Sequence, residues 1–283
     1  KNHPPLFEDN IEKGEGKDIA LFCYTSGTTG LPKGAMVSHR ALVNTSKAFA
    51  EAVEKISEEE QYLSFVAPSW ITEQMLGFGA HLHAGMELNF PEEPETVQEN
   101  IREIGADILF FGPRQWESMM RTVQVKIIDT SALRRFIYNL FLPLGYRLAD
   151  LKLARKEPNL LWLILGWVAY EAVFHPLKDK LGLLGTRVAL TGGAAISPDI
   201  LRYFLAIGVN IKLAYGSSEL GVISDQHDDD NKPETCGPSL PGVEMRLTSD
   251  SELLSRGWSI FSGYYKKPEA SKEMVPDGWW HTG

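Results

Sequence analysis

Cysteine is scarce in this sequence, since only Cys23 and Cys236 occur among its 283 residues. Two thiols are too few for a disulfide framework or a four-thiolate metal site, so we expect a reducing compartment. Positive charge is also in deficit, because 28 Lys and Arg face 37 Asp and Glu and give a formal net charge of -9. This balance excludes bulk electrostatic attraction to nucleic acid.

A long apolar run is absent as well. The longest uninterrupted run, Leu160 to Tyr170, is shorter than the roughly 20 residues that a membrane-spanning helix needs. We therefore expect a buried helix there, with a surface that docks on a membrane or a partner as the alternative. No secretory leader opens the chain, which starts at Lys1, so we expect a cytoplasmic protein and a chain that is part of a longer one.

Apolar residues make up 43% of the chain, which is enough for a sizeable core. Short strand-like runs alternate with amphipathic stretches; the runs are residues 18–24, 61–66, 86–90, 107–111, 187–190 and 210–214. Helical patterns follow the N-cap residues Ser38 and Ser197 and cover residues 94–104. This alternation predicts an α/β fold with layered, parallel-rich sheets flanked by helices.

The pattern of predicted secondary structure changes near residue 235. Residues 1–235 carry the α/β alternation, whereas Gly-punctuated short strands in 236–283 predict a small β-rich subdomain. An insert over about 121–186 begins with eight basic and two acidic residues and is rich in aromatic and aliphatic side chains. Either it contacts a membrane peripherally through 121–174, or it is a solvated helix face.

The most informative motif reads YTSGTTGLPKG, from Tyr24 to Gly34, directly after a predicted strand. Glycines turn backbone N–H groups toward an anion, hydroxyls donate to its oxygens and a lysine adds positive charge. The sequence therefore predicts a polyphosphate cradle, with a spacing that does not fit a Walker loop. Its residues are Thr25, Ser26, Gly27, Thr28, Thr29, Gly30 and Lys33.

Two further motifs follow predicted strands. Gly192, Gly193 and Ala194 would let a flat ring lie against the backbone, although a tight turn alone explains the same residues. The second motif comprises Tyr215, Gly216, Ser217, Ser218 and Glu219. It offers an aromatic face, hydroxyls and a carboxylate that suits Mg²⁺ on a phosphate. The three motifs together predict a nucleoside triphosphate site.

The order of these motifs resembles the adenylate-forming (AMP-binding) superfamily. Three later segments are similar to that family's motifs: GPSLPGVE at 237–244, SGYYKKPEAS at 262–271 and DGWWHTG at 277–283. FGPRQWE at 111–117 and the long insert after it most resemble long-chain fatty acid–CoA ligases. The chain thus resembles a fragment of the family's large N-terminal domain, without the N-terminal portion and the C-terminal lid domain.

The resemblance implies ATP-dependent activation of a fatty acid to acyl-adenylate and then acyl-CoA, with release of AMP and pyrophosphate. It implies ATP, Mg²⁺ and coenzyme A as cofactors, with residues 1–235 as the nucleotide- and acyl-binding part. Lys33 and Ser218 would contact phosphates, Glu219 would bind the metal, and Trp70 and Glu73 would lie at the acyl site. The adenine side would comprise Gly192, Gly193, Ala194, Tyr215 and Gly216.

Two other functions fit the same motifs. One is a ligase that stops at acyl-adenylate or loads a carrier protein. The other is a nucleotide-binding fragment without turnover, and we expect the chain as supplied to be inactive.

Overall fold

A six-stranded sheet with the order β4-β3-β5-β6-β7-β8 forms the centre of the computed structural model, which describes residues 4–25, 32–53, 55–227 and 232–282. The first five strands of that order run parallel, and β8 is antiparallel to β7. The strands are β3 (Gln61–Leu63), β4 (Glu87–Asn89), β5 (Ile108–Phe110), β6 (Val188–Thr191), β7 (Ile211–Ser217) and β8 (Gly221–Asp225). Every residue of β5 and β6 is buried, as both faces of a parallel sheet are covered.

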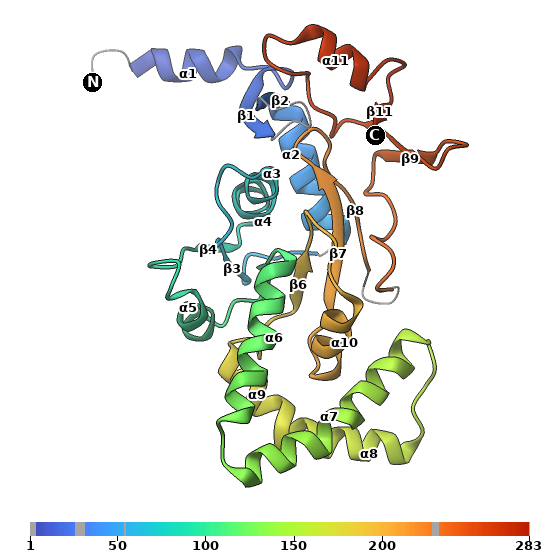
Figure 1. Cartoon of the computed structure of the whole chain (residues 1–283). Helices are drawn as coiled ribbons and strands as arrows, with labels where there is room; N and C mark the ends of the chain where they lie inside the picture. The colour runs from blue at the N-terminus through green and yellow to red at the C-terminus, as the bar shows by residue number, and fades with distance from the viewer. Residues whose placement is uncertain (1–3, 26–31, 54, 228–231, 283) are drawn as a thin grey trace.

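Helices cover the two faces of this sheet (Figure 1). Because side chains alternate along a strand, Ile108 and Phe110 of β5 pack against Phe49 and its neighbours, whereas Leu109 packs into the opposite cluster around Trp116. On the first face lie α2 (His39–Lys47), η1 (Ala48–Val53), α3 (Ile71–Glu73), η2 (Gln74–Gly79) and α4 (Ala80–Ala84). On the other lie α5 (Val97–Ile104), α6 (Pro113–Ile128), α9 (His175–Leu181) and α10 (Pro198–Ala206).

Two small antiparallel sheets lie toward the ends of the chain. One pairs β1 (Ile19–Thr25) with β2 (Lys33–Ser38), after helix α1 (Pro4–Lys13). The other has the order β11-β10-β9, from β9 (Val243–Leu247), β10 (Leu253–Gly257) and β11 (Trp280–His281), with α11 (Pro268–Met274) before β11. The segment 262–265 runs beside β2, since Met36 N donates to Gly263 O at 2.9 Å and Tyr265 N donates to Gly34 O at 2.9 Å.

The predicted fold class is confirmed: a parallel-rich sheet is flanked by helices and an antiparallel sheet follows it. Each of the six predicted strand regions contains a strand. The first of them, however, pairs with β2 outside the six-stranded sheet. The sequence reasoning missed β2 and β8, because β2 begins inside the glycine-rich motif and β8 is a short apolar run directly after Gly221.

The insert forms a helical hairpin, with α7 (Ala132–Leu153) followed by α8 (Leu160–Ala169) and η3 (Tyr170–Phe174), which continues into α9. Ser131 and Asn159 cap α7 and α8 by accepting bonds from backbone N–H groups. Gly145 lets α7 approach α10, because a Cβ there would lie 2.6 Å from Ala206 O. Figure 1 places the α7–α8 hairpin at the end of the molecule opposite both termini.

The prediction that residues 160–170 are buried is wrong. Seven of the nine residues 160–168 are large apolar side chains exposed to solvent, with Leu160 72% and Trp167 66% exposed. The continuous helical run Leu160–Leu181 has the length and apolar composition to cross a membrane, and 11% of its most apolar window is buried. The apolar run in the sequence is short, but the helix that contains it is not.

Candidate functional site

A cleft of about 680 Å³ opens where β5, β6 and β7 end. This position is where open α/β sheets bind ligands, because the loops after parallel strands diverge there. Its lining comes from the end of β1, from η1, from residues 69–76, from the ends of β5, β6 and β7, and from the turn between β7 and β8. Six stretches that are distant from one another in the sequence therefore meet in one cleft.

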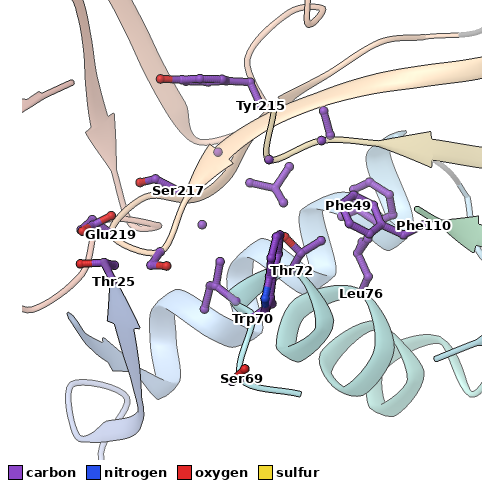
Figure 2. Close-up of a pocket in the computed structure, with 18 of the residues that line it drawn as sticks. Thr25, Phe49, Ser69, Trp70, Thr72, Leu76, Phe110, Tyr215, Ser217 and Glu219 are labelled. Carbon is purple, nitrogen blue, oxygen red and sulfur yellow. The ribbon is translucent and has the colours of Figure 1, made fainter. Parts of the chain in front are cut away.

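The cleft has two chemically different ends (Figure 2). Thr25, Ser217 and Glu219 lie together at one end, and Phe49, Phe110 and Leu76 form the other. Trp70 stands between them, 51% exposed, with its ring close enough to the backbone that a Cβ at Gly193 would lie 3.2 Å from it. The site can therefore hold a molecule with a polar, anionic part and an apolar part on either side of Trp70.

Glu219 is held in place at the polar end of the cleft. Its Oε1 accepts a 2.8 Å hydrogen bond from the Tyr264 hydroxyl, and the residue is 8% exposed. The predicted metal-binding carboxylate is therefore buried and hydrogen-bonded, and not freely exposed. Burial, together with the hydrogen bond and the charge of Glu219, raises the pKa of Tyr264 well above its usual range, so Tyr264 remains a donor.

Lys33 reaches the same tyrosine from β2. Its Nζ lies 5.2 Å from the centre of the Tyr264 ring, a cation–π distance. Tyr264 thus connects Lys33 with Glu219, although Lys33 itself does not line the cleft. The signal for Tyr264 was present in the SGYYKKPEAS motif, but nothing in the sequence alone placed it against Glu219.

The structure brings most of the predicted site residues that it describes into one place. The cleft is lined by Thr25, Trp70, Gly192, Gly193, Tyr215, Gly216, Ser218 and Glu219. Ala194 and Glu73 do not line it, and Ser26, Gly27, Thr28, Thr29 and Gly30 lie outside the described residues. Sequence reasoning missed the apolar lining of Phe49, Phe110 and Leu190, because each appeared only as part of a helix or strand pattern.

Gly216 is required by the backbone of the β7–β8 turn. A Cβ at Gly216 would lie 2.0 Å from Gly221 O, so any side chain there would force the two strands apart. Burial raises the pKa of the neighbouring Tyr215, whose ring lies at the edge of the cleft in Figure 2. This turn therefore fixes the aromatic face and the hydroxyl groups of Ser217 and Ser218 relative to one another.

Glu73 lies behind the cleft, not in it. It is 4% exposed, and its carboxylate accepts hydrogen bonds of 2.6 Å from Ser64 Oγ and 2.8 Å from the Tyr62 hydroxyl. Burial raises the pKa of Glu73, and the two hydrogen bonds only partly oppose that effect. The geometry gives Glu73 a structural position between β3 and η2, in place of the acyl-site position that the sequence predicted.

We expect Glu73 to make the fold less stable as pH rises. Its native pKa is above the unfolded value of about 4.3, so the native state holds the proton more tightly. Its stabilising contribution is present below the unfolded pKa and is lost as pH rises through the native pKa. Glu73→Gln should therefore flatten the fall in unfolding free energy between about pH 4 and pH 7. Urea unfolding across this range measures the pH dependence of the unfolding free energy, with the exposed Glu87→Gln as control. Equal slopes of unfolding free energy against pH for wild type and Glu73→Gln would contradict this prediction.

The fold and the cleft define a class: α/β proteins with a nucleotide-type site at the strand ends, lined by Gly-Gly and Tyr-Gly-Ser-Ser-Glu turns. The sequence pattern of the family described as "AMP-binding enzyme" matches residues 3–265. The chain belongs to the AMP-binding enzyme family.

Its relatives include long-chain acyl-CoA ligases. The chain is 26% identical over 308 residues to long chain acyl-CoA synthetase 4 of Arabidopsis thaliana, covering 98% of this chain and 45% of that protein. It is 28% identical over 287 residues to the long-chain-fatty-acid–CoA ligase ACSBG2 of Rattus norvegicus, covering 95% and 42%. The chain therefore spans about half the length of the curated relatives it matches.

Solved structures support the same fold. A malonyl-CoA ligase in a ternary product complex with methylmalonyl-CoA and AMP superposes with a TM-score of 0.68 at 24% identity, covering 96% of this chain and 50% of that one. Apo MatB from Rhodopseudomonas palustris superposes with a TM-score of 0.67 at 20% identity, covering 95% and 45%. At these identities the likeness establishes the fold alone.

Proposed function

We propose that this chain is the nucleotide- and acyl-binding part of a fatty acid–CoA ligase. The reaction activates a long-chain fatty acid with ATP to acyl-adenylate and pyrophosphate, and then transfers the acyl group to coenzyme A with release of AMP. The observation that carries the proposal is the two-ended cleft, in which Trp70 separates a hydroxyl- and carboxylate-lined end from an end of Phe49, Leu76 and Phe110. The similarity to long-chain acyl-CoA ligases supports the choice of acid.

The polar end fits a triphosphate with its metal ion. Mg²⁺ in phosphate sites usually takes one or two protein carboxylates and completes its shell with phosphate oxygens and water. Glu219 alone suits that pattern, since no cluster of three metal-ligating side chains occurs among the described residues. Bound there, the ion would neutralise the charge that develops on the phosphates.

The remaining groups at this end orient the nucleotide. Ser217, Ser218 and Thr25 offer hydroxyl donors to phosphate oxygens, and Lys33, beside Tyr264, supplies positive charge from β2. Tyr215 and the backbone of Gly192 and Gly193 offer flat surfaces to the adenine. Alignment and charge stabilisation are most of what attack of a carboxylate on the α-phosphorus requires, because no protein nucleophile takes part.

The experiment that tests this function is ATP–pyrophosphate exchange by the full-length protein with fatty acids of increasing chain length. We expect exchange that depends on the acid and is greatest for long chains; exchange with no added acid, or with acetate alone, would contradict the proposal.

A second assay, of acyl transfer, distinguishes the CoA ligase from a ligase that stops at acyl-adenylate or loads a carrier protein. Acyl transfer to coenzyme A supports the ligase, whereas transfer only to a carrier protein, or no transfer, favours the alternatives.

We further propose that the protein works in the cytoplasm at a membrane surface and contacts the lipid through the α7–α8 hairpin. The exposed apolar side chains of α8 adjoin basic residues of α7 and the loop after it, among them Arg147, Lys152 and Lys156. Phe174 and Leu181, later in the same helical run, are buried in the core around Trp116. The run is therefore suited to lie on an anionic surface and not to cross it.

Negative charge introduced on the apolar face of α8 should release the protein from lipid. We expect Leu161→Glu with Trp167→Glu to reduce co-sedimentation with anionic vesicles more than tenfold, because burying each large apolar side chain contributes about 1.5–3 kcal/mol. High salt should weaken wild-type binding, since each cation near an anionic surface contributes about 1 kcal/mol. Leu247→Glu, on exposed β9, is the matched control. Equal sedimentation of the double variant and wild type would contradict this contact.

A further inference from the structure

A second cavity lies among the helices and shares no lining residue with the cleft. Its volume is about 400 Å³, it is open to solvent on one side, and its lining comes from α5, α6, the first turns of α7, η3 and α9. Buried residues of its lining, such as Val123 and Leu181, belong to the hydrophobic core around Trp116, whereas Phe49 and Phe110 of the cleft belong to the core on the other face of the sheet. The cavity is therefore separate from the cleft.

The interior of this cavity is hydrocarbon. Val123, Tyr138 and Leu181 are buried in its floor, and Ile127, Val173 and Leu177 form its walls. The Tyr138 hydroxyl is directed to the Tyr203 hydroxyl at 3.4 Å, and the Gln98 amide donates to Leu181 O at 2.7 Å. The Thr122 hydroxyl likewise donates to Ser118 O at 2.9 Å, so these polar groups are engaged with the protein and apolar side chains make up most of the rest of the lining.

Three cations line the same cavity: Lys126, Arg134 and Lys180. No carboxylate is among its lining residues, and none of the three side chains forms an ion pair with another described residue. The nearby Asp179 is 3.8 Å from Arg102, on the α5 side. In a chain with a net charge of -9, the cavity thus combines an apolar interior with unneutralised positive charge.

We propose that this cavity binds a single-chain anionic amphiphile, with a carboxylate head at Lys126, Arg134 and Lys180 and the hydrocarbon chain against Val123, Val173 and Leu177. A small inorganic anion would leave the apolar interior unfilled, and a neutral lipid would leave the cations without a partner. The cavity volume is within the range of small-molecule sites. The inference rests on this cavity alone and goes beyond the proposed ligase reaction in the cleft.

The test is a titration of the whole 283-residue chain with dodecanoate, followed by NMR of labelled Ile, Leu and Val methyl groups. We expect saturable shifts of the methyl signals of Ile127, Val173 and Leu177. The triple variant Lys126→Gln, Arg134→Gln, Lys180→Gln should bind about tenfold more weakly, because three exposed ion pairs each contribute a fraction of a kcal/mol to about 1 kcal/mol. Dodecan-1-ol should bind wild type about tenfold more weakly than dodecanoate does, for the same reason.

A matched variant controls for net charge. Lys13→Gln, Lys55→Gln, Lys272→Gln removes three exposed cations that line neither the cavity nor the cleft, and it should bind dodecanoate as wild type does. Equal affinity of the cavity triple variant and wild type, or equal affinity for the alcohol, overturns the proposal. Shifts confined to Leu76, Leu190 and Val222 in the cleft also overturn it, while they support the acyl end of the cleft. Shifts confined to the methyl groups of the cavity support this site, and they count against fatty-acid binding at the apolar end of the cleft.

Discussion

Glu219→Gln is expected to reduce ATP–pyrophosphate exchange by the full-length protein about 100-fold or more, with little loss of stability. The amide keeps an oxygen that can accept from Tyr264, whose hydroxyl lies 2.8 Å from the carboxylate in the native protein. What is lost is the negative charge, and with it the metal ligand that holds the ion on the phosphates. Exchange rates at saturating Mg²⁺ and the unfolding midpoint of the same preparation give the two quantities.

The control for this prediction is a second buried carboxylate. Glu73→Gln replaces an equally buried carboxylate that lies outside the cleft, so it should retain exchange within a few-fold of wild type. If both variants lose exchange equally, the effect reflects folding and not metal binding. A folded Glu219→Gln variant that exchanges at the wild-type rate would contradict the role assigned to Glu219.

Trp116→Ala is expected to destabilise the fold by about 3–5 kcal/mol, a large part of the total for a chain of this kind. Trp116 is fully buried, and its indole N–H donates to Leu190 O at 3.1 Å. Its ring makes edge contacts with Phe111 and Phe204, at centroid distances of 5.2 and 5.0 Å. The truncation opens a cavity and removes one of the two hydrogen bonds to Leu190 O, which also accepts from Phe111 N at 3.1 Å.

Denaturant unfolding of Trp116→Ala beside Trp167→Ala measures this effect. Trp167 lies on the exposed face of α8, so its removal should change the unfolding free energy by about 0.5 kcal/mol or less. Similar losses for the two variants would show that Trp116 does not join the helical layer to the sheet in the way the contacts indicate.

Much of the fold and the site was predictable because small and polar residues directly after an apolar run indicate the end of a strand. Thr191-Gly192-Gly193 and Tyr215-Gly216-Ser217 each follow a buried apolar run, and parallel pairing of β6 with β7 brings both ends to one edge. Local spacing therefore predicts that Thr25, Gly192, Tyr215, Ser218 and Glu219 lie near one another, and all five line the cleft. Local sequence likewise predicts the N-caps Ser38 and Ser197, whose side chains accept hydrogen bonds from backbone N–H groups.

What the sequence could not supply was which apolar or charged groups face each other across the fold. Glu73 and Trp70 are three residues apart, yet one is buried against Tyr62 and the other stands in the cleft. The apolar run of α8 has the composition of a core helix, yet α8 packs on α7, which in turn packs on α10, and most of its apolar side chains are exposed. Such outcomes depend on long-range contacts, which local propensity does not encode.

Calorimetric titration of the 283-residue chain with ATP and Mg²⁺ tests the central claim most directly. We propose that the strand-end cleft is sufficient to bind the nucleotide. We expect one ATP bound per chain, with weaker binding in Glu219→Gln. The absence of ATP binding by the folded chain, or binding that Glu219→Gln leaves unchanged, would contradict it.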